Sequence, residues 1–166
     1  MNPATIRCEV RGVPAPGGSK TVQFPRRGGK IQYRAGSPVF FVRDDAGKKN
    51  TDWRRAVASA CRVAMNGAPP LGGPLSLRVV FWMPRPKSLR RGRAYPAVRP
   101  DATKLLRATE DALTGIAWRD DAQVCEQAVS KRYADDGRCG ATIEISNLPA
   151  VPPAPTVLAL PGSEPV

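Results

Sequence analysis

The chain has 166 residues, enough for one domain with an ordinary buried core and no stabilising disulfide or metal. Its net charge of +12 favours a polyanionic partner, above all nucleic acid, although basic residues kept for solubility would give the same composition. The absence of His excludes Ser-His and Cys-His nucleophile systems, so any catalysis must use carboxylates, Lys or Arg, hydroxyls or a metal.

Targeting signals and cysteines narrow the class further. No apolar run is long enough to cross a membrane, and the N-terminal MNPATIRCEV lacks the apolar segment of a secretion signal. We therefore expect a cytoplasmic protein with no membrane partner. Cys8, Cys61, Cys125 and Cys139 have no Cys-x-x-Cys spacing. We interpret them as reduced, mostly buried thiols rather than as four zinc ligands gathered from distant positions.

The first half of the sequence predicts strands followed by a helix. Residues 5–13 alternate apolar and polar and predict a strand, which the PAPGGSK segment ends. Residues 22–42 predict two short strand pieces around a turn at Arg27, Gly28 and Gly29. Thr51 or Asp52 can cap a helix that Gly67 ends, with apolar residues on one face: Trp53, Val57, Ala60, Cys61 and Ala64.

A strongly apolar strand and a basic loop come next. Residues 74–84, PLSLRVVFWMP, are apolar at nearly every position after Arg78, which predicts a strand in the centre of a sheet. The segment from 84 to 100 has no periodicity and no acid, and it carries six cations. Such a loop either merely connects two elements or binds a phosphate backbone. We favour binding, by Arg85, Lys87, Arg90, Arg91, Arg93 and Arg99, together with Lys104 and Lys131.

The second half predicts a helix and two more strands. The helix runs from about Thr103 to Thr114, and Gly115 stops it. Residues 123–132 and 140–145 predict strands that a turn at Asp135, Asp136 and Gly137 joins as a hairpin. The order of elements predicts an α+β fold, a small mixed β-sheet with two helices packed on one face. We expect a domain over residues 1–146. Residues 147–166 hold six prolines and predict a disordered tail.

Acids surround the second helix of this basic chain. Asp101 precedes the helix, Asp111 lies within it, and Asp120 and Asp121 follow it. Carboxylate oxygens suit Mg²⁺ or Mn²⁺, and such an ion can activate water for attack on a phosphodiester. A surface charge patch remains the alternative, because the helix dipole alone explains an acid at the position of Asp101. A helix of about 12 residues is about 18 Å long, so Asp101 and Asp121 meet only if residues 115–121 fold back or the helix begins later.

The same stretch resembles a known family. The pattern PDxxxLLRxxxDALTGxxxxDDAQV, from Pro100 to Val124, is similar to that of the RusA family of Holliday-junction resolvases of phages and prophages, and residues 129–145 look like its terminal hairpin. The resemblance implies a RusA-like fold and a homodimer that binds four-way DNA junctions. It also implies Mg²⁺-dependent nicking of symmetric strands during DNA recombination and repair, in a bacterial cytoplasm, without a small-molecule cofactor.

The resemblance carries over residue by residue. Asp101 and Asp121 match catalytic, metal-binding aspartates, Asp120 and Asp111 match further acids of the metal site, and Arg107 stands where the family has a lysine. Arg107 either pairs with Asp111 on the surface or, because arginine keeps its proton, clamps a phosphate.

The sequence departs from the family pattern at two positions. Thr103 and Lys104 replace a family aspartate and asparagine, which makes Glu110, Asp111 or Asp120 a candidate for the missing ligand. Three functions are thus open: a metal-dependent resolvase, a catalytically inactive protein that binds branched DNA, and a general nucleic-acid-binding protein. The third hypothesis is supported by the net charge alone.

Overall fold

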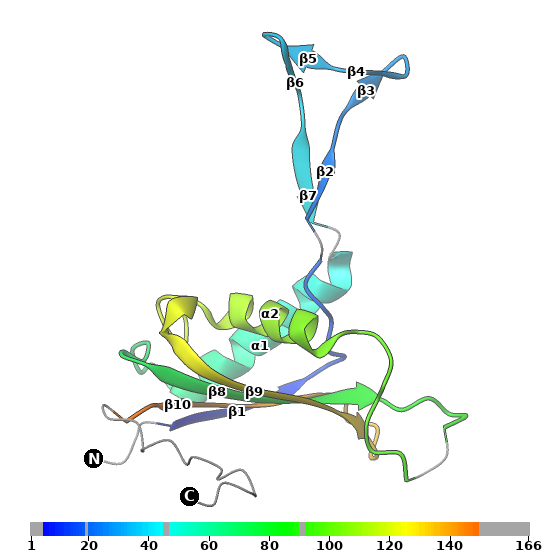
Figure 1. The fold of residues 1–166 in the computed structure, drawn as a ribbon. Helices are drawn as coiled ribbons and strands as arrows, with labels where there is room; N and C mark the ends of the chain where they lie inside the picture. The colour runs from blue at the N-terminus through cyan, green and yellow to red at the C-terminus, as the bar shows by residue number, and fades with distance from the viewer. Residues whose placement is uncertain (1–4, 19, 45–46, 90–91, 150–166) are drawn as a thin grey trace, which may run out of the picture.

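The structure, a computed structural model, describes residues 5–18, 20–44, 47–89 and 92–149. It consists of a compact body and a long arm that is inserted between the first strand and the first helix (Figure 1). The body contains, in chain order, β1 (Thr5–Arg11), α1 (Gly47–Met65), β8 (Leu75–Pro84), α2 (Ala102–Leu113), a short 3₁₀ helix η1 (Asp121–Gln123), β9 (Val124–Ala134) and β10 (Gly140–Asn147).

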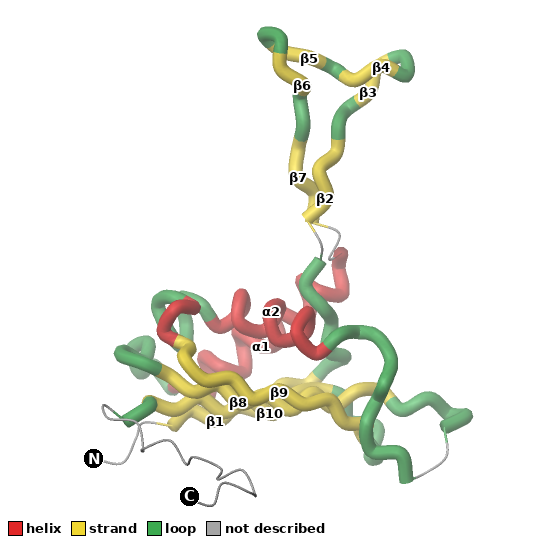
Figure 2. The backbone as a smooth tube through the Cα atoms, in the orientation of Figure 1, coloured by secondary structure: helices red, strands yellow, loops and turns green. Residues whose placement is uncertain are grey.

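The four strands of the body form one mixed sheet in the order β1-β10-β8-β9. β8 pairs antiparallel with β10 and parallel with β9. Both helices lie on the same side of this sheet (Figure 2). The expected α+β fold, with two helices on one face of a small mixed sheet, is confirmed, and so is the central position of the apolar strand β8.

The expected hairpin of the last two strands is wrong. β9 and β10 do follow one another, but they are not neighbours, because β8 lies between them. β8 is the strand with the most buried side chains, and a central position pairs its backbone on both edges. Adjacent strands are about 4.8 Å apart, so the residues between Ala134 and Gly140 can span the end of β8.

The core forms between the sheet and the two helices. β8 alternates buried and less buried residues, and Leu75, Leu77, Val79 and Phe81 are fully buried beneath the helices. From α1 the core receives Trp53, Val57, Cys61 and Met65. Ala60, which was predicted on this face, is half-buried beside it, whereas Ala64, also predicted there, is exposed. From α2 it receives Leu105, Leu106, Ala108, Thr109, Ala112 and Leu113. Trp53 satisfies its indole N–H on the hydroxyl of Thr109, 3.3 Å away.

Helix α1 begins at Gly47, one turn before the expected caps at Thr51 and Asp52. Its first turns connect the arm to the body. The buried side chain of Asn50 donates to the carbonyl of Pro16 over 2.9 Å, and the N–H of Gly17 donates to the carbonyl of Lys104 over 2.9 Å. The chain that enters the arm is therefore fixed to both helices.

The arm replaces the two short strand pieces expected over 22–42. Its stem is the antiparallel pair β2 (Lys20–Gln23) and β7 (Phe41–Asp44). Its far end carries two small hairpins, β3–β4 (Arg26–Arg27, Lys30–Ile31) and β5–β6 (Tyr33–Arg34, Ser37–Pro38), as Figure 1 shows. Positive φ angles at Gly28 and Gly29, and at Ala35 and Gly36, give these hairpins two-residue turns. The turn at Gly28 and Gly29 was predicted, whereas the second hairpin was not.

Three remaining expectations concern the tail, the membrane and the cysteines. β10 reaches Asn147, and the proline-rich segment from 150 onward lies outside the described residues. Neither helix within the described residues has the length and apolarity needed to cross a bilayer. All four cysteines are free thiols; Cys8 and Cys61 are buried in the core, Cys125 is exposed and Cys139 is half-buried.

Candidate active site

The outer face of α2 carries the residues that the sequence singled out. Thr103, Arg107, Asp111 and Thr114 recur at three- and four-residue spacing, and all four are exposed. Asp101 precedes the first turn of this helix, and Thr114 follows its last residue. The candidate site is therefore an exposed stripe along α2, with carboxylates at both of its ends.

Asp101 lies at the N-terminal end of this stripe without capping the helix. It occupies the N-cap position, but its side chain makes no capping hydrogen bond, and its nearest ion-pair partner is Lys104, with 4.0 Å between Nζ and Oδ2. A cleft of about 1240 Å³ opens here. Its wall includes Asp101 and the cations Arg11, Lys49, Arg99, Lys104 and Lys131. Asp101 thus lies in a mostly basic cleft whose other carboxylate is Asp52.

Lys131 supports the loop that leads into Asp101. Its ammonium group donates to the carbonyls of Val98 and Pro100, at 2.9 and 2.8 Å. This lysine comes from the sheet beneath the helix, at the position where β9 pairs with Phe81 of β8. We expected Lys131 to bind DNA, but here its charge holds the backbone that orients Asp101.

The C-terminal end of the stripe holds Asp121. Gly115, at φ 77°, turns the chain sharply after α2, and its N–H donates to the carbonyl of Trp118 over 2.7 Å. This fold-back directs Asp121 to the end of the helix, where its Oδ1 accepts hydrogen bonds from the hydroxyl of Thr114 and, over 2.9 Å, from the indole N–H of Trp118. Asp121 is exposed, yet it is oriented by two donors.

Asp120 has a different role from its neighbour. Its carboxylate accepts the N–H of Ala122 over 2.8 Å and begins η1, and Gln123 completes a capping box by accepting the N–H of Asp120. Gln123 also donates to the carbonyls of Leu71 and Gly73. Asp120 and Gln123 therefore hold the turn together, which leaves Asp121 as the outward-facing member of the pair.

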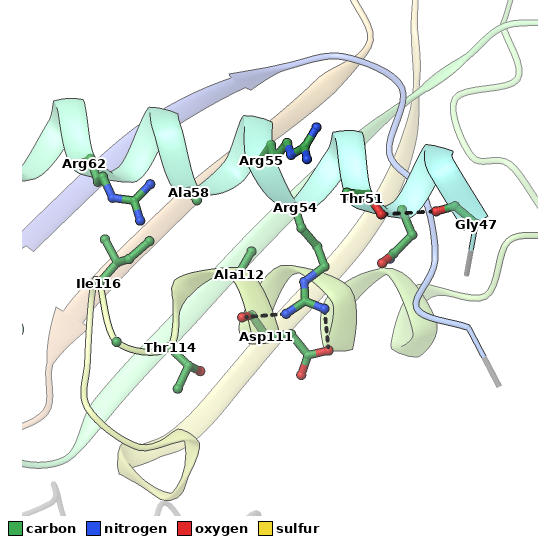
Figure 3. A pocket seen from close by; sticks show the side chains of 12 residues that line it. Gly47, Thr51, Arg54, Arg55, Ala58, Arg62, Asp111, Ala112, Thr114 and Ile116 are labelled. Carbon is green, nitrogen blue, oxygen red and sulfur yellow. Dashed lines mark hydrogen bonds and ion pairs between the residues drawn. The ribbon is translucent and has the colours of Figure 1, made fainter. Parts of the chain in front are cut away.

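A groove of about 850 Å³ runs between α1 and the C-terminal half of α2 (Figure 3). Arg54 and Arg62, two arginines of α1 that are eight residues apart, line one side, and Asp111 and Thr114 line the other. Arg54 donates to the carbonyl of Asp111 over 3.2 Å and lies 4.0 Å from its carboxylate. A surface pair with Asp111 was one of the two roles left open for Arg107; the structure pairs Asp111 with Arg54.

Glu110 belongs to the same acidic group. Burial raises the pKa of Glu110, and the negative charges of Asp121 and Asp111 raise it further. Its Oε1 accepts a hydrogen bond from Gln127 of β9 at 2.5 Å. The charges of both aspartates thus act on the carboxyl group of Glu110, so these three acids form one electrostatic group at the C-terminal end of α2.

The structure does not bring Asp101 and Asp121 together in one chain. The twelve residues of α2 separate them by about 18 Å, and residues 115–121 fold back onto the near end of the helix only. Among the described residues, no cluster of three or more His, Cys, Asp or Glu side chains could hold a metal ion. Mg²⁺, however, often binds through one or two carboxylates plus water and phosphate. Asp121 together with either Glu110 or Asp111 fits that requirement, since a cation would relieve the repulsion that raises the pKa of Glu110.

The cations of the basic loop that were expected to bind DNA, together with Lys104, differ in their exposure. Lys87, Arg93, Arg99 and Lys104 are exposed. Arg85 is largely buried; it donates to Asp135 over 2.9 Å and to the carbonyl of Arg93 over 2.9 Å, and it lies 5.0 Å from the ring centroid of Tyr133. Arg85 therefore fixes the loop. Arg90 and Arg91 lie outside the described residues.

These features define the structural class of the protein, and the comparison with known families then gives its family. A mixed sheet covered by two helices, with an exposed stripe on the second helix that has carboxylates at both of its ends, makes this an α+β protein of the RusA-like type. The chain belongs to the RusA family: residues 41–146, more than half of its length, match the family described as endodeoxyribonuclease RusA. The resemblance inferred from the residues is thereby confirmed.

A curated relative is also similar to this chain. The two are 32% identical over 76 residues, which is 40% of this chain and 54% of the relative, the uncharacterized protein YqaN of Bacillus subtilis (strain 168). The chain thus spans about half the length of the curated relative that it matches.

Sequence reasoning missed several residues of the site. Arg54 and Arg62 are spaced as one ridge of a helix, and this pattern could have indicated a basic face on α1. Glu110 was considered only as a replacement ligand. The roles of Thr114 and Trp118 depend on a turn that brings Asp121 back to the helix, and only Gly115 indicates this turn in the sequence.

Proposed function

We propose that this chain is a divalent-metal-dependent endodeoxyribonuclease that cuts branched DNA, and specifically that it resolves four-way junctions by paired nicks in recombination and repair. The observation that supports this most is an oriented carboxylate, Asp121, beside a groove lined with arginines, in a chain of the RusA family. We assign the activity to the bacterial cytoplasm, in a cell that carries the gene on a phage or prophage.

The residues of the C-terminal acidic group would hold Mg²⁺ or Mn²⁺. In this proposal Asp121 is the principal ligand, and Glu110 or Asp111 is the second. The bound cation would supply charge neutralisation for the phosphate and a more acidic water. Asp120 was expected among the ligands, but we assign it a capping role because its carboxylate is directed to Ala122.

Cations of the helices and the basic loop would hold the DNA backbone. Arg107 is exposed in the middle of the stripe, between Asp101 and Asp121, where a guanidinium can contact a phosphate by two hydrogen bonds. Lys87, Arg93, Arg99 and Lys104 extend the positive surface toward the N-terminal cleft. Asp101 shares that cleft with Asp52. Any catalytic role of Asp101 must explain its distance from Asp121.

A homodimer offers such an explanation. Two-fold symmetry applied across the middle of α2 would set two copies of this helix antiparallel, so that Asp101 of one copy approaches Asp121 of the other. Each of the two resulting sites would contain acids from both chains. Two equivalent sites are also what paired nicks on opposite strands require.

The alternative function is a catalytically inactive protein that binds branched DNA. Thr103 and Lys104 favour it, because a hydroxyl and an ammonium stand where the family pattern has two oxygen-rich side chains. The basic clefts at both ends of α2 would serve binding equally well without chemistry.

The deciding experiment compares a labelled four-way junction with a linear duplex of the same sequence, each with Mg²⁺ or Mn²⁺. Paired nicks on the junction, absent with Asp121→Asn, are the expected result. Tight binding of the junction without nicks under either metal would support the inactive binding protein. Equal binding to junction and duplex, without nicks, would leave only a general affinity for nucleic acid.

A further inference from the structure

The arm, residues 20–44, is the part of the molecule that neither the core nor the proposed site uses. Its strands pair only with one another among the described elements, as three separate two-stranded pieces. Figure 2 shows that it extends away from the body on the side of the helices. A two-stranded ribbon is marginally stable alone in water. Such an element is therefore expected to have a partner.

The charge of the arm indicates what this partner is. Residues 20–44 contain six Lys and Arg and a single acid, Asp44, at the base of the stem. The cations of the far end, Arg26, Arg27, Lys30 and Arg34, are all exposed. None of these four forms an ion pair with any residue that the structure describes. The body does not neutralise them, so an external polyanion is the favoured occupant.

Exposed aromatic side chains accompany these cations. Phe40 is 59% exposed and Tyr33 is 64% exposed, and Phe24 and Phe41 are nearly half exposed. The rings of Phe24 and Phe40 lie 6.4 Å apart between their centroids and form a small apolar platform on the stem side of the hairpins. Cations contact the phosphates of a DNA duplex, and side chains such as that of Tyr33 contact its phosphates and sugars.

The base of the arm stands at the candidate active site. Its incoming strand is attached through Gly17 to the carbonyl of Lys104 on α2, and its outgoing strand leads into α1 at Gly47. The first turns of α1 line both clefts: Asn50 and Thr51 face the groove beside Asp111, and Lys49 and Asp52 face the cleft of Asp101. DNA lying across α2 would pass directly beside the arm.

We propose that the arm is a clamp for duplex DNA, which grips the backbone of a double helix leading away from the cut site. A pair of antiparallel strands fits against or within the major groove of B-form DNA. This inference rests on the proposed function, since it takes DNA as the substrate of the body. The family match begins at Phe41, so most of the arm lies outside the matched residues. A second copy of this chain is the less favoured occupant, because two arms of like charge repel.

The test uses Arg27→Ala/Lys30→Ala, which removes two facing cations of the β3–β4 hairpin. The control is Arg7→Ala/Arg78→Ala, an equal loss of charge on exposed residues of the sheet face turned away from the helices. Binding is measured on four-way junctions whose arms are about two helical turns long or shorter than one turn. All three proteins are also compared by thermal unfolding.

The clamp predicts that wild-type protein and control prefer the long-armed junction. The arm variant should lose this preference, bind the long-armed junction about tenfold more weakly, and show a salt slope smaller by about 2. Equal affinity of arm variant and control for the long-armed junction would overturn the proposal. So would a change in molecular mass in solution with unchanged DNA binding, which would assign the arm to contacts between copies.

Failure of the clamp is distinguishable from failure of the proposed function. If wild-type protein nicks junctions but the arm variant binds both substrates normally, only the clamp is wrong. If wild-type protein shows an arm-dependent gain in affinity for any duplex but never nicks, the clamp stands and the nuclease assignment falls.

Discussion

Trp118 donates its indole N–H to the carboxylate of Asp121 over 2.9 Å, from a side chain that is itself fully buried. The buried ring cannot move without disturbing the core, so the carboxylate is held at the end of α2. The hydroxyl of Thr114 contacts the same oxygen. Both donors reach Oδ1, so Oδ2 is the oxygen that the proposed metal ion would contact.

Removal of the Thr114 hydroxyl should loosen this carboxylate with little effect on the fold. Thr114→Val keeps the shape of an exposed side chain, and we expect cleavage to fall by about tenfold, as supporting contacts to metal ligands commonly do. Thr114→Ser keeps the hydroxyl and should cleave normally. Junction cleavage at several Mg²⁺ concentrations is the measurement, and the Val variant should need more metal. Identical metal dependence in both variants would contradict this role.

Substitutions of the two neighbouring aspartates should affect different properties, stability for Asp120 and cleavage for Asp121. Asp120→Ala removes the cap of η1 and should cost about 1 kcal/mol of unfolding free energy, with cleavage retained. Asp121→Asn should leave the unfolding transition nearly unchanged but reduce cleavage by on the order of 100-fold. Urea unfolding and junction cleavage of both variants check this. A normal cutting rate in Asp121→Asn would disprove the assignment of Asp121.

Glu110 should make stability depend on pH. Burial and the charges of Asp121 and Asp111 raise the pKa of Glu110 in the folded chain. A carboxyl group whose pKa is raised in the folded state contributes its full stabilisation of the fold below its unfolded-state pKa. This contribution is lost as the pH rises through the folded-state pKa. Glu110→Gln should therefore raise the melting temperature at pH 7–8 and leave it unchanged below about pH 4. The exposed Glu126→Gln is the control, with no such difference expected.

Two lysines beside the N-terminal cleft should behave differently. Lys131→Met loses two hydrogen bonds to the carbonyls of Val98 and Pro100, and we expect a loss of about 1–3 kcal/mol in unfolding free energy. Lys87→Met changes an exposed cation and should alter stability by less than about 0.5 kcal/mol, while the salt slope of DNA binding falls by about 1. Unfolding curves and salt titrations of both variants separate structural from DNA-binding charge.

The sequence predicted the elements that local patterns determine. The continuous apolar run of β8 required a central strand, and Gly115 correctly marked the end of α2. Sequence patterns failed where the structure depends on contacts between distant parts of the chain. A turn at Asp135 and Asp136 reveals a reversal of direction, but it does not reveal that β8 separates the two strands. The contact of Arg54 with Asp111 likewise depends on how two helices pack.

The separation of Asp101 from Asp121 gives the last prediction. If each site combines Asp101 of one copy with Asp121 of another, Asp101→Asn and Asp121→Asn chains should complement each other. A mixed dimer then contains one site with both aspartates intact and one with neither. Each variant alone should not cleave, whereas the mixture should nick junctions on one strand only. The measurement is cleavage after the two chains are unfolded together and refolded.

The wild-type chain mixed with the double variant, Asp101→Asn/Asp121→Asn, is the matched control. In that mixed dimer each composite site lacks one aspartate, so it should not cut. If each site is instead built within a single chain, the opposite results are expected. The wild-type chain would then keep one complete site in the control dimer and cut. The two single variants would not restore cleavage to each other. The 18 Å of helix between the two carboxylates, about twelve residues at 1.5 Å each, makes the composite arrangement the expected result.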